Sequence, residues 1–324
     1  MCRVSVVIPA YNAEQTLSKL LCALACQTLR DGYEVIVVNN GSTDDTHKIL
    51  CGIIENYPVP LKIVQQPQGV SIATVRNLGV SLARGNILAF IDSDCEPPLD
   101  WLQSGVELVE SYSSPVLLSG SCQPPPNGTW VEKAWHSTRS GHKLGTCFVH
   151  GANFFISKNL FQEVGGFREH IETSEDYDLG RRVSYNNKVV PAPNLLVVHY
   201  GEANTLYKKI KKEMWYSKSM FDTLMFDHYY KPFWISLFFL IVFSMIFVEL
   251  FYGNLMITFI LLLVIVLLSV LLATYFCFRS NNYIYFLQLI PISFSYLLGR
   301  AIGIICNIYC LLFPSFLKKW SWFY

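Results

Sequence analysis

The C-terminal part of this 324-residue chain is almost without charge. The chain has 25 basic and 24 acidic residues, and only 5 of these charged residues lie among the last 92 positions. The apolar runs found there reach the length of about 20 residues that an α-helix needs to cross a bilayer. This scarcity of charge argues against a second soluble domain, and we expect residues 233–324 to be a transmembrane region.

Other absences narrow the classes of function. The net charge of +1 gives no reason to expect a nucleic-acid partner. None of the ten cysteines forms a Cys-x-x-Cys pair, which favours reduced core thiols over disulfides or zinc. The Gly-x-Gly-x-x-Gly turn of dinucleotide folds is missing, which disfavours a dehydrogenase. No apolar leader with a cleavage site opens the chain, so we expect the N-terminal region to be cytoplasmic.

Strands and helices alternate over the first hundred residues. Apolar runs typical of buried strands occupy residues 4–9, 33–38, 61–64 and 87–91, and apolar residues at helical spacing occupy residues 14–27 and 70–84. Such alternation predicts an α/β fold with a doubly wound, mostly parallel sheet.

Two aspartates follow the last of these strands. Asp92 and Asp94 are separated by Ser93, at the carboxyl end of a strand, where open α/β sheets bind ligands. Carboxylate oxygens in this place suit Mg²⁺ or Mn²⁺, which also take ligands from substrate phosphates. The sequence Asp-x-Asp is also common in solvated turns, so the pair alone does not establish a metal site.

Four ordered blocks carry a resemblance to a known family. They are VSVVIPAYN at residues 4–12, VVNNGSTDDT at 37–46, VRNLGVSLARGNILAFIDSD at 75–94 and SEDYDL at 174–179. Together they resemble the family 2 glycosyltransferases, which have the glycosyltransferase-A fold, over about residues 3 to 200. The resemblance implies transfer of a sugar from a UDP- or GDP-linked donor, with inversion at the anomeric carbon and a divalent metal, Mg²⁺ or Mn²⁺, on the diphosphate.

The same resemblance implies roles in donor binding. It places the following residues against the donor or its metal: Pro9, Ala10, Tyr11 and Asn12 around the nucleobase, Asn40 at the base edge, Arg76 at the nucleotide or diphosphate, Asp92 with Ser93 at the ribose or sugar, and Asp94 with His199 at the metal. Asn40 stands where the family usually has an aspartate that reads uracil. Simpler alternatives remain for Tyr11 as a loop aromatic, Arg76 as a surface arginine and His199 as a core histidine.

A second pair of acids belongs to the acceptor side. Asp176 matches the family's general base, and Glu175 would orient the acceptor, although both could merely cap a helix that starts after Ser174. The residues expected to line the acceptor pocket are Gly151, Ala152, Asn153 and Trp215. Processive relatives carry a Gln-x-x-Arg-Trp motif in this region, and the nearest match here, residues 211–215, ends in the tryptophan but lacks the glutamine and the arginine. We therefore expect one sugar per encounter.

A basic segment leads into the apolar region. Within the linker, residues 203–232, the stretch 206–216 holds four lysines beside aromatic residues, from Lys208 to Lys212, which is typical of an interfacial helix against anionic headgroups. A solvated basic helix is the alternative. Residues 1–202 would then be the catalytic domain.

Membrane crossings are expected at residues 233–252, 255–278 and 283–317. The third stretch contains Pro291, Gly299 and Gly303, and could be one tilted helix or two half-membrane pieces. All flanking cations would be cytoplasmic only with an even number of crossings, so two and three spans both remain open. Arg300 within this stretch suggests a partner for a lipid phosphate.

These features together predict a multi-pass membrane glycosyltransferase with a cytoplasmic catalytic domain. It would move a single sugar to a lipid-linked or membrane-proximal acceptor, in the synthesis of a cell-envelope polysaccharide or a glycolipid. A nucleotidyltransferase on a similar fold and a non-catalytic membrane scaffold are the alternatives.

Overall fold

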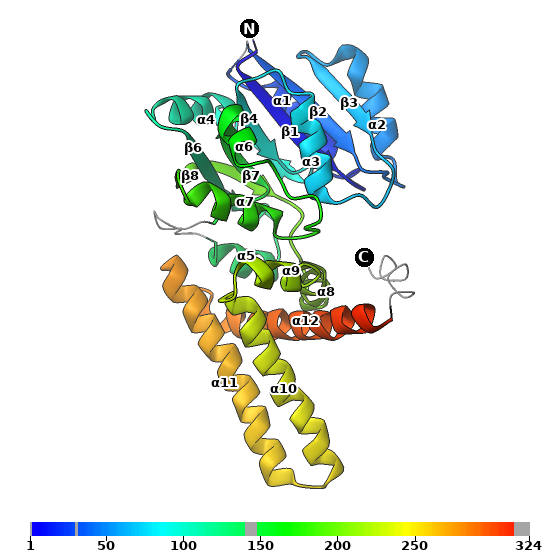
Figure 1. Cartoon of the computed structure of the whole chain (residues 1–324), viewed down its shortest axis with the longest axis vertical. Helices are drawn as coiled ribbons and strands as arrows, with labels where there is room; N and C mark the ends of the chain where they lie inside the picture. The colour runs from blue at the N-terminus through cyan, green and yellow to red at the C-terminus, as the bar shows by residue number, and fades with distance from the viewer. Residues whose placement is uncertain (1, 30–31, 140–147, 314–324) are drawn as a thin grey trace. The chain divides into compact units, whose positions relative to one another are not determined.

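The structure, a computed structural model, describes residues 2–29, 32–139 and 148–313. The chain divides into two compact units (Figure 1). The first comprises Met1–Pro126 and Gly141–Glu202, and the second comprises Asn127–Ser140 and Ala203–Tyr324. The short segment Asn127–Ser140 thus groups with the C-terminal unit although it lies inside the N-terminal sequence.

The first unit is built on one sheet. Among the described residues its order is β3-β2-β1-β4-β7-β6-β8-β5. The strands are β1 (Val4–Ala10), β2 (Tyr33–Asn39), β3 (Leu61–Gln65), β4 (Ile87–Ile91), β5 (Cys95–Glu96), β6 (Val116–Gln123), β7 (Asn153–Ser157) and β8 (Lys188–His199). Strands β3, β2, β1 and β4 are parallel, β7 runs antiparallel to both β4 and β6, and β5 runs antiparallel to β8. The predicted mostly parallel α/β sheet is confirmed.

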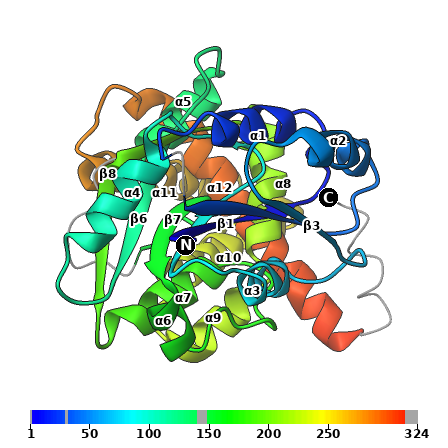
Figure 2. The same cartoon turned by 90° about the horizontal axis from the view of Figure 1, so that it is seen from above.

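Helices cover both faces of this sheet. They are α1 (Leu17–Ala25), α2 (Thr46–Ile53) with the 3-10 turn η1 (Ile54–Asn56), α3 (Ile72–Ser81), α4 (Trp101–Glu110), α6 (Lys158–Glu163) and α7 (Glu175–Ser184). Figure 2 shows α1 and α2 on one side of the sheet and α3 on the other. Val6 of β1 packs with α1 and α4, whereas its neighbour Val7 packs with α3. Burial of both faces explains why these strands are continuous apolar runs.

The short elements β5 and α5 are among those that were not predicted from the sequence. Strand β5 has only two residues, which is too short to show a period. Helix α5 (Trp130–Ser137) begins with a capping box, in which Thr129 Oγ1 accepts from the Glu132 amide and the Glu132 carboxylate accepts from the Thr129 amide at 2.7 Å. The Thr-x-x-Glu spacing was the available signal.

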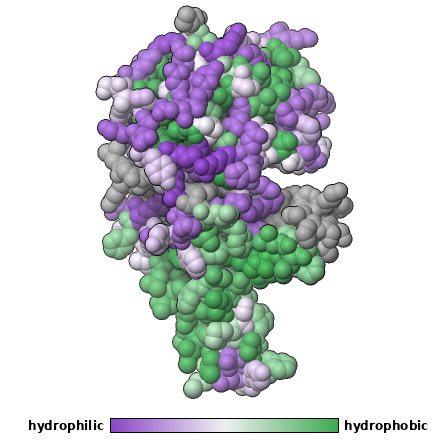
Figure 3. Space-filling view, in the orientation of Figure 1, coloured by the Kyte–Doolittle hydropathy of each residue, from purple (hydrophilic) through white to green (hydrophobic). Residues whose placement is uncertain are grey.

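In its described residues, the second unit contains α5 and five further helices. These are α8 (Leu206–Tyr216), α9 (Met220–Phe226), α10 (Lys231–Phe251), α11 (Leu255–Ser280) and α12 (Phe286–Leu312). Helices α10 and α11 form a hairpin whose turn places Gly253 at a φ of 72° and lets Asn254 cap α11. Large apolar side chains remain exposed along it, and its surface is green over most of its length in Figure 3. Within the described residues, α10, α11 and α12 are long and apolar enough to cross a membrane.

Helix α12 is a single helix, so the two half-membrane pieces considered for residues 283–317 are not found. Its glycines are packing positions rather than breaks, because a Cβ at Gly299 would lie 2.5 Å from the Ile210 carbonyl oxygen of α8. A Cβ at Gly303 would lie 1.6 Å from Ser217 Oγ. The backbones of α8 and α12 can therefore approach closely.

Helices α8 and α12 also share buried charges. Glu213 of α8 is fully buried and accepts from Lys209 Nζ at 2.5 Å and from Arg300 Nε at 2.8 Å. Lys209, predicted to face headgroups, is fully buried instead, and Arg300, predicted to meet a lipid phosphate, has Glu213 as its anionic partner. The amphipathic pattern did not reveal this ion cluster, because its third member lies 87 residues away along the chain.

Candidate active site

The loop after β1 lies beside the end of β2. Pro9 and Ala10 are the last residues of β1, and the Ala10 carbonyl accepts from the Asn40 amide at 2.8 Å. Asn12 adopts a φ of 48°, and its side-chain oxygen accepts from the Thr43 amide at 2.8 Å. Tyr11 is 49% exposed, so its ring is accessible for stacking. This arrangement suits the predicted nucleobase site.

Two asparagines at the end of β2 have different environments. The Asn39 side-chain oxygen already has two donors, because it accepts from Ser42 Oγ at 2.5 Å and from the Ser42 amide at 3.3 Å. The side-chain nitrogen of Asn40 donates a hydrogen bond to the Val70 carbonyl at 3.1 Å. Its Oδ1 is buried and has no hydrogen-bond partner within the described part of the chain. Asn40 is therefore the one of the two with an acceptor left for a base N–H group.

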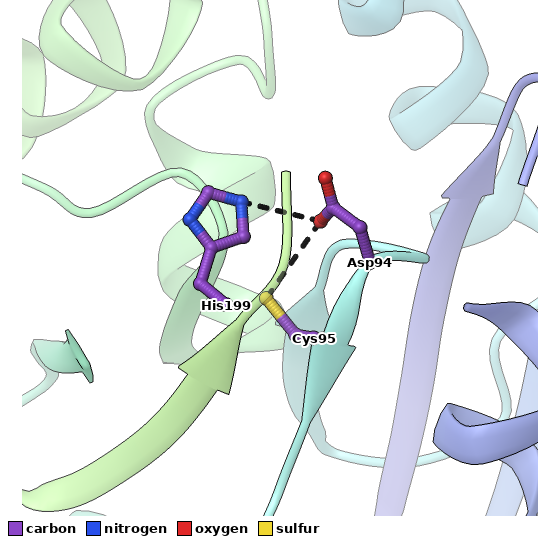
Figure 4. A group of neighbouring side chains, drawn as sticks. All are labelled: Asp94, Cys95 and His199. Atoms are coloured by element: carbon purple, nitrogen blue, oxygen red, sulfur yellow. Dashed lines mark hydrogen bonds and ion pairs between the residues drawn. The ribbon is translucent and has the colours of Figure 1, made fainter. Parts of the chain in front are cut away.

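The predicted metal ligands come together after β4. Two backbone hydrogen bonds hold the turn that follows β4. The Cys95 amide donates to the Asp92 carbonyl at 3.1 Å, and the Tyr200 amide donates to the Asp94 carbonyl at 2.8 Å. Asp94 Oδ1 lies 3.2 Å from His199 Nε2 (Figure 4). Burial disfavours a charged imidazole, but the neighbouring Asp94 outweighs it and raises the pKa of His199 to about 9.

The local backbone leaves room for this carboxylate. A Cβ at position 201 would lie 1.7 Å from Asp94 Oδ2, so Gly201 is required for the observed position of Asp94. A carboxylate and an imidazole are suitable ligands for Mn²⁺ and leave other positions to water and phosphate oxygens. The residues present therefore fit a divalent metal. Sequence reasoning missed Gly201, for which no local signal exists.

Arg76 connects the two groups of acids. Its Nη2 lies 2.8 Å from Asp92 Oδ1 and 2.9 Å from the Gly151 carbonyl oxygen, and its Nη1 donates to Glu175. The residue is only 1% exposed. This geometry does not support the predicted contact between Arg76 and the donor diphosphate, because the guanidinium is buried among protein groups. It instead fixes the positions of Asp92 and Glu175.

Asp176 is held by two backbone amides. Its Oδ2 accepts from the Gly151 amide at 3.0 Å and its Oδ1 accepts from the Tyr177 amide at 2.8 Å. A Cβ at position 151 would lie 2.7 Å from Asp176 Oδ2, so glycine is needed there. Ser174, the N-cap residue of α7, has a left-handed φ of 68° and makes no side-chain cap.

Glu175 and Asp176 therefore differ in environment. Burial raises the pKa of Glu175 to about 7, with the Asp176 charge adding to the shift and Arg76 opposing it. Glu175 is 6% exposed, whereas Asp176 is partly accessible. The accessible acid is the better placed of the two to reach a bound hydroxyl.

Two predicted acceptor residues, Ala152 and Asn153, are buried. Asn153 is fully buried, with its oxygen accepting from Trp101 Nε1 and its nitrogen donating to the Ser121 and Leu195 carbonyls. Ala152 is 5% exposed. Their predicted place in the pocket is wrong for Asn153 and unsupported for Ala152, since both residues belong to the sheet core. Trp215 lies on α8 of the second unit.

Comparisons with known proteins bear on this site. The sequence profile described as Glycosyl transferase family 2 matches residues 5–165. Glycosyltransferase AglE of Haloferax volcanii is 33% identical over 187 residues, which cover 56% of this chain and 61% of that protein. The glucosyl-dolichyl phosphate glucuronosyltransferase of the same organism is 22% identical over 249 residues, which cover 72% of this chain and 74% of that protein. The chain thus spans less than two thirds of the first of these relatives.

Solved structures share the fold. The mannosyltransferase PcManGT from Pyrobaculum calidifontis, in complex with GDP-Man and Mn²⁺, has a TM-score of 0.64 and 18% identity, covering 95% of this chain and 87% of that one. TarS 1-349 of S. aureus, in complex with UDP-GlcNAc, has a TM-score of 0.50 and 17% identity, covering 66% and 65%. The chain therefore carries a family 2 glycosyltransferase domain of glycosyltransferase-A fold, and the family predicted from its four sequence blocks is confirmed.

Proposed function

We propose that this protein is a membrane-bound inverting glycosyltransferase that moves one sugar from a UDP- or GDP-linked donor to a lipid-linked or membrane-proximal acceptor. The observation that carries the proposal is the network centred on the buried Arg76, which pairs with a donor-side acid, Asp92, and an acceptor-side acid, Glu175. A reaction between two bound substrates needs donor and acceptor groups at fixed mutual positions.

The donor end would bind through groups that the fold already positions. Tyr11 would stack on the base and Asn40 would accept from its edge, while Asp92 and Ser93 face the ribose or sugar. Asp94 and His199 would hold Mg²⁺ or Mn²⁺. When bound, the metal neutralises the charge that develops on the departing diphosphate.

The acceptor end supplies the base. As the acceptor oxygen forms its bond to the anomeric carbon, the bond from that carbon to the diphosphate oxygen breaks, and Asp176 takes the hydroxyl proton. The amides of Gly151 and Tyr177 fix both carboxylate oxygens in place. Glu175 would orient the acceptor. Arg76 is a positioning residue, since it binds the carbonyl of the same Gly151 whose amide holds Asp176.

Relatives and the apolar helices support the substrate classes. GDP-Man with Mn²⁺ occupies one structural neighbour and UDP-GlcNAc another, so both nucleotides remain candidates. A relative named for a dolichyl phosphate substrate supports a lipid-linked acceptor. The exposed apolar surface of α10 and α11 supports membrane attachment, and Trp215 on α8 is a candidate acceptor contact. The domain boundaries 1–202, 203–232 and 233–324 are part of this proposal.

Replacing the metal ligand tests the site directly. Asp94→Asn should weaken Mn²⁺-dependent binding of a nucleoside diphosphate by at least 100-fold, because loss of even an outer-shell partner typically costs about 10–100-fold. Binding is measured by calorimetry with UDP and with GDP. Asp100→Asn, an exposed acid at the start of α4, is the control and should bind normally. If nucleotide binding by Asp94→Asn depended on Mn²⁺ as strongly as in the unmodified protein, the metal would not bind at Asp94.

We also propose two membrane crossings, α10 and α11, with the catalytic domain on the cytoplasmic side. Figure 1 shows α12 running across the end of the α10–α11 hairpin that lies opposite its turn, rather than alongside it. Over an 18-residue apolar stretch of each helix, 61% of α12 is buried inside the protein, against 28% of α10 and 22% of α11. Two crossings also keep Lys208–Lys212 and Arg279 on the same side.

Cysteine labelling of intact cells tests this topology. With a membrane-impermeant maleimide, a cysteine at Asn254 should react from outside, whereas cysteines at Lys212 and at Phe313 should react only after permeabilisation. The unmodified chain gives the baseline from native cysteines. Labelling of Phe313→Cys from outside would show three crossings, and labelling of Lys212→Cys would reverse the orientation.

A further inference from the structure

A thiol lies beside the proposed metal ligands. Cys95 follows Asp94 and lies directly opposite His199 in the antiparallel β5–β8 pair. Side chains of directly opposite residues share a face of the sheet. On the other side of β8, Cys122 of β6 pairs with Val197, which is two residues from His199 and therefore on the same face.

Distances show that the ligand atoms converge. Those of Asp94, Cys95 and His199 all lie within 4.8 Å of one another, and Cys95 Sγ lies 3.9 Å from Asp94 Oδ1 (Figure 4). Cys122 Sγ lies 3.6 Å from His150 Nδ1. His150 Nε2 is buried without a hydrogen-bond partner in the parts of the chain that are described. The donor-metal site is thus bordered by thiols and imidazoles, which a pure Mg²⁺ site does not need.

The donor set decides which ion is preferred. Mg²⁺ and Mn²⁺ favour oxygen, whereas Zn²⁺ favours thiolate and imidazole and is satisfied by three protein ligands with one open position. For a given set of ligands, Zn²⁺ also binds more tightly than Mn²⁺. A thiolate added to a carboxylate and an imidazole therefore shifts selectivity further toward Zn²⁺.

We propose that Asp94, Cys95 and His199 form a Zn²⁺ site that overlaps the donor-metal site, so that Zn²⁺ and the activating ion exclude each other. On binding, the Cys95 thiol releases its proton to solvent and forms a Zn–S bond, with no change of oxidation state. Spacing along the sequence gave no sign of such a site, because β-sheet pairing brings together residues that are 104 positions apart. The inhibitory consequence rests on the proposed function, but the binding itself does not.

Cadmium reports on the thiolate without any activity assay. In the full-length protein with the exposed Cys22, Cys26 and Cys51 replaced by serine, Cd²⁺ without nucleotide should produce a thiolate-to-metal charge-transfer band in the ultraviolet. Cys95→Ser should remove that band. It should also weaken Zn²⁺ binding at least tenfold in competition with a chromophoric chelator, while Mn²⁺ affinity changes less than threefold.

The neighbouring thiol supplies the matched control. Cys122→Ser, which alters a buried cysteine outside the three-ligand set, should keep the band and the Zn²⁺ affinity. Cys95→Ala repeats the test without a buried hydroxyl.

Persistence of the band in both Cys95 variants, or its loss in Cys122→Ser, would overturn the proposal. No band in the parent protein, together with intact Mn²⁺-dependent nucleotide binding, would reject the Zn²⁺ site alone. A band without Mn²⁺-dependent nucleotide binding would instead reject the proposed function.

Discussion

Asp176→Asn should lower the rate of sugar transfer by about 10²–10⁴-fold, the usual contribution of a positioned general base. The amide cannot accept the acceptor's proton, so the hydroxyl must attack without assistance. Donor binding should survive, because Asp176 lies on the acceptor side of the Arg76 network. Transfer is measured under single-turnover conditions with saturating nucleotide sugar, and donor binding by calorimetry.

The structure adds a cost that must be separated from catalysis. Asp176 accepts from the amides of both Gly151 and Tyr177, and asparagine has only one acceptor atom. One amide therefore loses its partner, which costs about 1–3 kcal/mol of folding free energy. Asp178→Asn controls for stability loss in the same helix, since Asp178 pairs with Arg168 and Arg182 and is 1% exposed. It should destabilise the fold without a comparable loss of transfer.

Glu175 is the rival for the role of base. Its pKa of about 7 means that a reaction depending on ionised Glu175 would accelerate as the pH rises through 7. If Glu175→Gln abolished that rise and also abolished transfer, while Asp176→Asn transferred sugar at a near-normal rate, the roles of the two acids would be exchanged.

The sequence pattern was sufficient to predict strands whose formation depends on neighbouring residues of the chain. Strand β4 has the predicted bounds of residues 87–91, because a run of apolar residues closed by acids admits little else. The neighbouring β1 and β2 were predicted within one residue of their observed ends for the same reason. Parallel order followed from the alternation of these strands with helices.

Pattern failed where burial of a polar side chain depends on distant partners. Arg76 is polar on a helix and resembles a ligand contact, but Asp92 and Glu175, the latter 99 residues away, enclose it. Asn153 looked like a pocket residue, yet Trp101 and Leu195 satisfy its amide inside the core. A single sequence contains no local signal for such pairings, since they arise only when the sheet assembles.

The ion cluster of the second unit gives the largest expected effect on stability. Burial alone would raise the pKa of Glu213, but Lys209 and Arg300 outweigh it and lower the pKa, so Glu213 is ionised at neutral pH. Lys209 Nζ also lies 3.0 Å from the centroid of the Trp135 ring. One carboxylate thus offsets two cations that are shielded from water.

Glu213→Gln should therefore destabilise this unit by about 3–5 kcal/mol, the range typical of breaking a buried ion pair by removing one partner. Denaturant unfolding in detergent micelles measures the change. Glu110→Gln, which breaks the exposed pair with Arg3, is the matched control and should cost about 1 kcal/mol or less. Equal shifts in the two variants would show that Glu213 contributes no more than a surface pair.

A triple replacement separates charge from packing. Lys209→Met, Glu213→Leu and Arg300→Met together remove every charge of the cluster while keeping apolar volume between α8 and α12. Because apolar replacement of a complete buried ion cluster is often neutral or stabilising, the triple variant should recover most of the stability that Glu213→Gln loses. Recovery would show that Glu213→Gln loses stability because it leaves a buried charge uncompensated. A loss as large as that of Glu213→Gln would show that the stability depends on the packing of the helix interface instead.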